Sequence, residues 1–165
     1  MIQLVKKETE MKKILLLILS LILCAVPVFA DDAAEAVAQF NKYVQAANSY
    51  SNTIESMYAP NAKIIRQVVK PDGTTANATT DKATYMKQMK LSSIAAKAKG
   101  YRNNYSDVSV AKAANGYKVS ALRQPGNEAY KLKAYQVWQK DAAGNWVIVE
   151  ELMQTKEQIF LKYVD

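Results

Sequence analysis

The sequence has 165 residues, a net charge of +7, no histidine and a single cysteine, Cys24. Without histidine, and with its cysteine in an N-terminal apolar segment, the chain has no Ser-His-Asp or Cys-His nucleophilic site and no zinc or copper bound by imidazole or thiolate. Its five glycines form no phosphate-binding loop, and its lysines are spread rather than clustered. We therefore expect no metal, no cofactor and no nucleic-acid partner.

The N-terminal segment has the pattern of a secretory signal peptide. A short basic stretch precedes 13 mostly apolar residues at 14–26, and Pro27 ends the run. Val28 and Ala30 then occupy the −3 and −1 positions of a cleavage site, where small residues are required. The pattern predicts a signal peptide over residues 1–30 that is cleaved after Ala30. Cleavage removes four lysines and two glutamates, which lowers the net charge from +7 to +5.

Other interpretations of this segment fit less well. A membrane anchor needs about 20 apolar residues, and lipidation of Cys24 needs a small residue where Leu23 stands. The ten residues before Met11 have no place in such a signal, so we place the true start at Met11. We expect a periplasmic or secreted protein, not attached to a membrane after processing, with a single domain at 31–165.

The first half of this domain contains helices and then a strand. We expect a helix at 31–48, a short helical piece at 53–58 and a turn at 59–61. A strand at 63–70, a tight turn at 71–73 and an edge strand or loop at 74–80 follow. Asp32 and Glu35 form a capping pattern at the start of the first helix. Apolar residues then recur at three- and four-residue spacing, which predicts one buried stripe along this helix.

The second half contains one helix and then mostly strands. A helix capped by Thr80 or Asp81 carries Tyr85, Met86, Met89 and Ile94 and ends before Gly100. Strands follow at 101–111 and 117–124, and a hairpin over 130–154 turns at the loop 140–145; a short helix with Thr155 and Gln158 near its cap closes the chain. Helices followed by a meander of strands predict an α+β fold.

Two segments carry a resemblance to a known superfamily. The chain reads YAPNAKII at 58–65 and DAAGNWVI at 141–148. These resemble the "YAPDA" and "DGxWxI" segments of the nuclear transport factor 2-like (NTF2-like, or SnoaL-like) superfamily, whose order of elements is also similar over nearly all of 31–165. The resemblance implies a cone: a strongly curved antiparallel sheet wrapped around the N-terminal helices, with a pocket inside. It does not imply one function, because this fold carries many.

One position speaks against isomerase chemistry. Superfamily isomerases resembling ketosteroid isomerase carry a general-base aspartate eight residues after the tyrosine of the first motif. Counting from Tyr58 gives Arg66 here, and a guanidinium cannot take up a proton. Arg66 could bind an anion or form a structural ion pair. Strict alternation in the last strand puts Glu150 on the face of Trp146, which the resemblance points into the cone, so we expect Glu150 to be its partner.

Aromatic residues supply the remaining pocket candidates. Tyr43, Tyr58 and Tyr85 lie on helix faces that should meet the sheet. Trp146 is a further candidate, because the resemblance suggests that it points into the cone. Aromatic residues at such positions are usually core, but tyrosine hydroxyls around a cone also suit a partly apolar ligand.

Three functions stay open. The first is a non-catalytic binder of a small, partly apolar ligand that could be anionic. The second is an isomerase, dehydratase or hydrolase that uses a pocket carboxylate such as Glu150. The third is a dimeric interaction module, because Val147, Val149 and Met153 would form an apolar outer sheet face. That face predicts a homodimer.

Overall fold

The computed structural model describes residues 28–126 and 128–164. The chain divides into two units, 1–32 and 33–165, and the account below concerns the second. Most of the predicted signal peptide lies outside the described residues, so its cleavage stays a prediction. None of the described helices is long and apolar enough to cross a membrane.

Two α-helices and two short 3-10 helices are described. These are α2 (Val28–Asn48), η1 (Asn52–Met57), α3 (Lys82–Ala98) and η2 (Gln158–Tyr163). Helix α2 starts before Asp32, so the predicted cap by Asp32 and Glu35 is wrong. The cap of α3 is confirmed, because the side chain of Asp81 accepts a hydrogen bond from the backbone N–H of Thr84 at 2.9 Å. Tyr85 and Met86 of this helix are buried, whereas Ile94 is 77% exposed.

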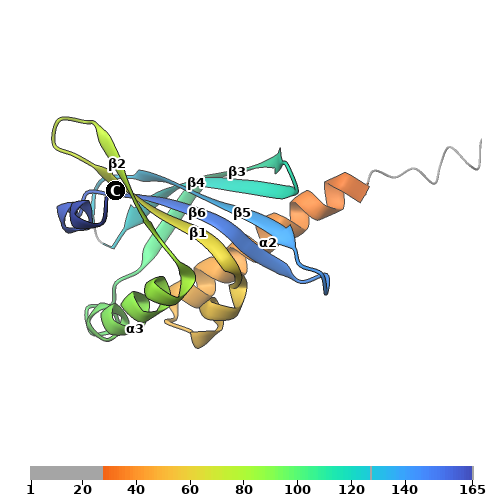
Figure 1. The fold of residues 1–165 in the computed structure, drawn as a ribbon, viewed down its shortest axis with the longest axis horizontal. Helices are drawn as coiled ribbons and strands as arrows, with labels where there is room; N and C mark the ends of the chain where they lie inside the picture. The colour runs from red at the N-terminus through yellow and green to blue at the C-terminus, as the bar shows by residue number, and fades with distance from the viewer. Residues whose placement is uncertain (1–27, 127, 165) are drawn as a thin grey trace, which may run out of the picture. The chain divides into compact units, whose positions relative to one another are not determined.

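Six strands form one sheet, with α2 and α3 on the same side of it (Figure 1). The strands are β1 (Tyr58–Val69), β2 (Thr75–Thr80), β3 (Asn103–Ala113), β4 (Gly116–Pro125), β5 (Leu132–Lys140) and β6 (Trp146–Thr155). Their order is β2-β1-β6-β5-β4-β3, so β2 and β3 are the edge strands of an unclosed sheet, and Ala78 of β2 also forms an isolated bridge with Val164. All pairs are antiparallel except β1 with β6, which are parallel. The fully antiparallel sheet that we predicted is therefore corrected at this pair.

The first strand includes the segment that was predicted as a turn. Pro60 lies inside β1, although proline has no N–H to donate to a neighbouring strand. The structure accommodates it where pairing is interrupted. The register of β1 against β6 shifts between Tyr58 and Lys63, and the pairing with β2 begins only at Ile64. The predicted turn at 59–61 is therefore an irregular start of the strand.

A bulge in β6 decides which acidic residue faces inward. Ile148 pairs with Trp138 of β5, but Glu150 pairs with Val137, the preceding residue of β5, which leaves Val149 as one extra residue. A one-residue insertion reverses the side-chain alternation beyond it. Our strict alternation from Trp146 therefore fails after Ile148.

The consequence is a change of face for the rest of β6. Glu151 is fully buried and Met153 is 8% exposed, both in the interior, whereas Glu150 is only half-buried. Glu150 is therefore not the buried acid. Met153 also leaves the outer apolar face from which we predicted a homodimer. Val147 and Val149, the other two residues of that face, are half-buried against the core. The homodimer itself stays a prediction.

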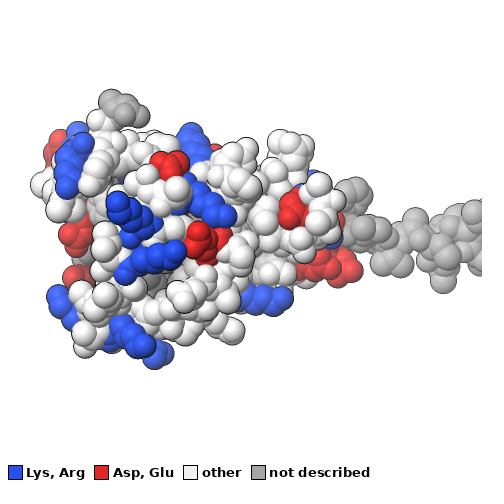
Figure 2. Space-filling view, turned by 60° about the horizontal axis from the view of Figure 1, so that its bottom comes forward, with Lys and Arg blue, Asp and Glu red and all other residues white. Residues whose placement is uncertain are grey.

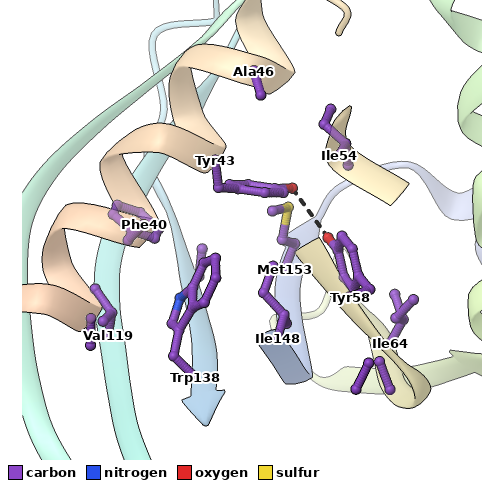
Figure 3. Packing of buried hydrophobic residues seen from close by; sticks show 14 of the residues in the cluster. Phe40, Tyr43, Ala46, Ile54, Tyr58, Ile64, Val119, Trp138, Ile148 and Met153 are labelled. Carbon is purple, nitrogen blue, oxygen red and sulfur yellow. Dashed lines mark hydrogen bonds between the residues drawn. The ribbon is translucent and has the colours of Figure 1, made fainter. Parts of the chain in front are cut away.

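The core fills the space between α2 and the sheet (Figure 3). Phe40 and Tyr43 of α2 point towards Trp138 of β5 and Met153 of β6. Trp138, Phe40 and Tyr43 are each at most 2% exposed. The predicted stripe of α2 is thus confirmed as the helix face that packs against the sheet. Burying large side chains of this kind stabilises a fold by about 1.5–3 kcal/mol each.

Candidate functional site

A cavity of about 580 Å³ lies next to this core, between α3, the ends of the strands and η2. Most of its walls are apolar or aromatic. Residues of α3 include Tyr85 and Met89, the sheet supplies Leu132 and Met153, and η2 supplies Phe160. Such a volume suits a small molecule. Among the described residues, no group of three or more acidic, histidine or cysteine side chains could hold a metal ion.

Behind the cavity wall lies a buried polar cluster made of Tyr58, Arg66, Tyr85, Gln136 and Glu151, which we call the inner cluster. Glu151 is its centre. Its carboxylate accepts hydrogen bonds from the Tyr58 hydroxyl at 2.5 Å, from Arg66 Nη1 at 3.0 Å and from Gln136 Nε2 at 2.8 Å. Both oxygens are used, and the residue is 0% exposed. A buried carboxylate is costly unless donors surround it, and three donors from three different side chains surround this one.

Arg66 connects the inner cluster to the cavity. Its Nη2 donates to the Tyr85 hydroxyl at 2.6 Å, and its guanidinium carbon lies 4.7 Å from the centre of the Tyr85 ring. Burial favours the neutral form of Arg66, but Tyr85 and Glu151 outweigh burial, and the pKa of the guanidinium is raised. The sequence left two roles open for Arg66, anion binding and a structural ion pair. Arg66 forms an ion pair, but its partner is Glu151 and not the predicted Glu150.

The tyrosines of this region stay protonated. Burial, and then the charge of Glu151, raise the pKa of both Tyr43 and Tyr58 well above the ordinary value. Burial also raises the pKa of Tyr85, although Arg66 works in the opposite direction. The hydroxyls of Tyr43 and Tyr58 lie 3.4 Å apart (Figure 3). Each hydroxyl can therefore donate a hydrogen bond at any physiological pH.

The predicted pocket residues divide into two groups. Arg66, Tyr43 and Tyr85 line the cavity. The other three do not. Tyr58 lies in the inner cluster, Glu150 is on the opposite face of the sheet, and Trp146 is at the far end of β6, where its Nε1 donates to Glu35 at 2.8 Å.

Glu150 has a different partner from the one predicted. The Tyr135 hydroxyl donates to its Oε1 at 2.6 Å. Burial, together with this bond, raises the pKa of Tyr135 to about 12. The pair belongs to the outer face of the sheet, so Glu150 cannot exchange a proton with a molecule in the cavity.

Arg123 was missed by the sequence analysis, although it is the second guanidinium of the cavity wall. Its signal was present in the alternation of β4. Tyr117, Val119 and Ala121 share one face of that strand, and each is at most 6% exposed. Arg123 continues the same face and is 7% exposed. A basic residue at the end of an apolar inward face marks a position with a special role.

The comparisons with known proteins add evidence on the fold. No family model and no curated protein matches this sequence. A solved NTF2-like protein of unknown function from Pseudomonas putida KT2440 is 13% identical, over 76% of this chain and 87% of its own, with a TM-score of 0.57. An NTF2-like protein with a cystatin-like fold from Novosphingobium aromaticivorans is 12% identical, over 82% and 88%, with a TM-score of 0.57.

Nuclear transport factor 2 of Cryptosporidium parvum is also similar, at 12% identity over 78% of this chain and 94% of its own, with a TM-score of 0.50. Similarity at such low identity concerns the fold and not the activity. The curved, unclosed sheet and the N-terminal helix of this chain match these structures. The α+β fold predicted from the sequence is therefore confirmed, and this protein has the NTF2-like cone fold.

Proposed function

We propose that this protein is an exported, non-catalytic binding protein that holds a small, partly apolar molecule in the cavity between α3 and η2. The observation that carries the proposal is the cavity itself, about 580 Å³ in volume and lined largely by apolar and tyrosine side chains. Ligand sites have this character: apolar walls that supply affinity and a few polar groups that fix orientation. Tyr43, Tyr85 and Arg66 are such groups here.

The positions of the acidic residues favour binding over catalysis. A general acid or base must come within hydrogen-bond reach of its substrate. Glu151 does not line the cavity, and its oxygens already accept from three side chains. The two carboxylates that do line it, Glu128 and Glu157, are exposed. A molecule inside the cavity would meet hydroxyls and guanidinium groups instead of a buried base.

The surface supports a small ligand in preference to a polyanion. Figure 2 shows basic side chains interspersed with acidic ones on the face that it presents, without one continuous basic area. Nucleic-acid binding depends on such an area. We also propose that the cone is exported, as the signal-peptide pattern predicts.

A fluorescent probe tests the cavity. N-phenylnaphthylamine is an uncharged aromatic molecule that brightens in apolar surroundings. We expect the purified protein to bind it, and we expect Ala96→Trp to weaken binding at least tenfold because Ala96 lines the cavity. The matched control is Ala95→Trp, since Ala95 precedes it on α3 and is exposed outside the cavity.

Two results would count against the proposal. Equal affinity of the two tryptophan variants would place the probe elsewhere on the protein. Conversion of a carbonyl or ester substrate that is abolished by Glu151→Gln, in a protein that stays folded, would move the assignment to the enzyme alternative.

A further inference from the structure

Among the described residues, Arg123 donates its side-chain hydrogen bonds to uncharged acceptors only. Its Nη1 donates to Asn103 Oδ1 at 2.8 Å and its Nη2 to the backbone carbonyl of Gln154 at 2.6 Å. Both acceptors are neutral. Its Nε is buried and has no hydrogen-bond partner in the part of the chain that the structure describes. Within residues 28–126 and 128–164, no carboxylate oxygen lies within 4.0 Å of this guanidinium.

An unpaired buried cation is unfavourable in an apolar protein. Arginine cannot lose its proton under physiological conditions, and a buried charge costs several kcal/mol unless it is paired. Arg123 is 93% buried, since only 7% of it is exposed. The fold nevertheless holds it firmly. Asn103, which accepts from Arg123, is itself fixed by Asn48 at the end of α2, whose side chain bonds to its backbone N–H at 2.8 Å and its carbonyl at 2.9 Å.

The other guanidinium of the cavity provides the contrast. Arg66 lines the same cavity, but Glu151 neutralises it at 3.0 Å. The two residues therefore differ in what they can offer to a ligand. Arg66 with Glu151 presents a neutral pair, whereas Arg123 presents a net positive charge next to the apolar side chains of Leu132 and Met153, which also line the cavity.

We propose that Arg123 is the anion receptor of the cavity, and that the ligand is an amphipathic molecule with an apolar body and one carboxylate, sulfonate or phosphate group. The inference rests on the proposed binding function and names the chemical class of its ligand. The anionic group would supply a counter-charge next to Arg123, where the described residues place no carboxylate within 4.0 Å, and the apolar body would lie against Leu132 and Met153. Guanidinium groups suit such oxyanions because their planar N–H donors match the anion's oxygens.

Two probes with the same aromatic body test this assignment. Anilinonaphthalene sulfonate carries a sulfonate that N-phenylnaphthylamine lacks. We expect the protein to bind the sulfonate at least tenfold more tightly than the uncharged probe, and we expect Arg123→Met to reduce this ratio of affinities to below twofold. If Arg123→Met does not fold, Arg123→Gln replaces it, because glutamine can still donate to Asn103 or Gln154.

Two other basic residues serve as controls. Arg102 is exposed outside the cavity, and Lys162 lies in the cavity lining on η2. We expect Arg102→Met and Lys162→Met to keep the preference for the sulfonate. Near-ultraviolet circular dichroism of each variant checks that packing is native, because the sulfonate probe also binds loosely packed states.

The outcomes separate the two proposals. If both probes bind equally well, or if Lys162→Met removes the preference and Arg123→Met does not, the role of Arg123 is wrong while the cavity remains a binding site. If neither probe binds, the proposed binding function is wrong, and the inference falls with it.

Discussion

Replacing Arg66 by leucine is expected to destabilise the protein by about 3–5 kcal/mol, because it leaves the fully buried Glu151 carboxylate without its counter-charge. The control is the ion pair between Lys90 and Glu55, which has nearly the same length, 3.1 Å against 3.0 Å. Its side chains are 66% and 52% exposed. Lys90→Leu should therefore cost only about 0–1 kcal/mol. Urea unfolding at neutral pH measures both free energies.

The double variant isolates the interaction between the two residues. When Glu151 is also replaced by glutamine, Arg66→Leu no longer leaves a buried carboxylate without its partner. We therefore expect the double variant to lose clearly less unfolding free energy than the sum of the two single variants. Additive effects would show that the pair is not coupled. In that case the ion pair between Arg66 and Glu151 would not stabilise the fold, and the account of the inner cluster would be wrong.

Removing the Tyr58 hydroxyl is expected to cost about 1.5–3 kcal/mol, the range for hydrogen bonds to charged groups. Tyr58→Phe removes a buried donor to Glu151 at 2.5 Å. Tyr135→Phe is the matched comparison, because it removes a donor to Glu150 at 2.6 Å on the half-buried outer face. Solvent can replace that donor, so we expect a loss below about 1 kcal/mol. Thermal or urea unfolding compares the two variants.

A larger loss of stability in Tyr135→Phe than in Tyr58→Phe would contradict the assignment of Glu151 to the inner face of the sheet and Glu150 to the outer face. It would mean that Glu150, and not Glu151, is the buried acid. The two tyrosines therefore test the bulge at Val149 as well as the inner cluster, since the bulge determines which glutamate points inward.

The sequence alone predicted the order of the elements and the superfamily fold. It could do so because local patterns produce them: apolar spacing in α2, the Asp81 cap of α3, and the glycine of the 140–145 loop, Gly144, which adopts a φ of +83°. It failed at Pro60 and at Val149 for one reason. Both errors depend on pairing with another strand, and a single sequence contains no direct record of register.

The candidate site was predicted only in part for the same reason. Arg66 lines the cavity, but its acidic partner is Glu151 and not the predicted Glu150, because the bulge shifts the register of β6 by one residue. Arg123 could have been found from the apolar alternation of β4. Its uncharged acceptors could not have been found in this way, because they depend on how Asn103 of β3 and the backbone of Gln154 of β6 lie around it.

Methionine methyl groups offer the most direct measurement of where a ligand binds. Met89 and Met153 line the cavity, whereas Met57 of η1 does not. In a spectrum of the protein labelled with carbon-13 at its methionine methyls, saturating N-phenylnaphthylamine should shift the signals of Met89 and Met153, because the aromatic ring lies beside them. The signal of Met57 should stay in place. Unchanged Met89 and Met153 signals under saturation would contradict the claim that the cone holds a small molecule.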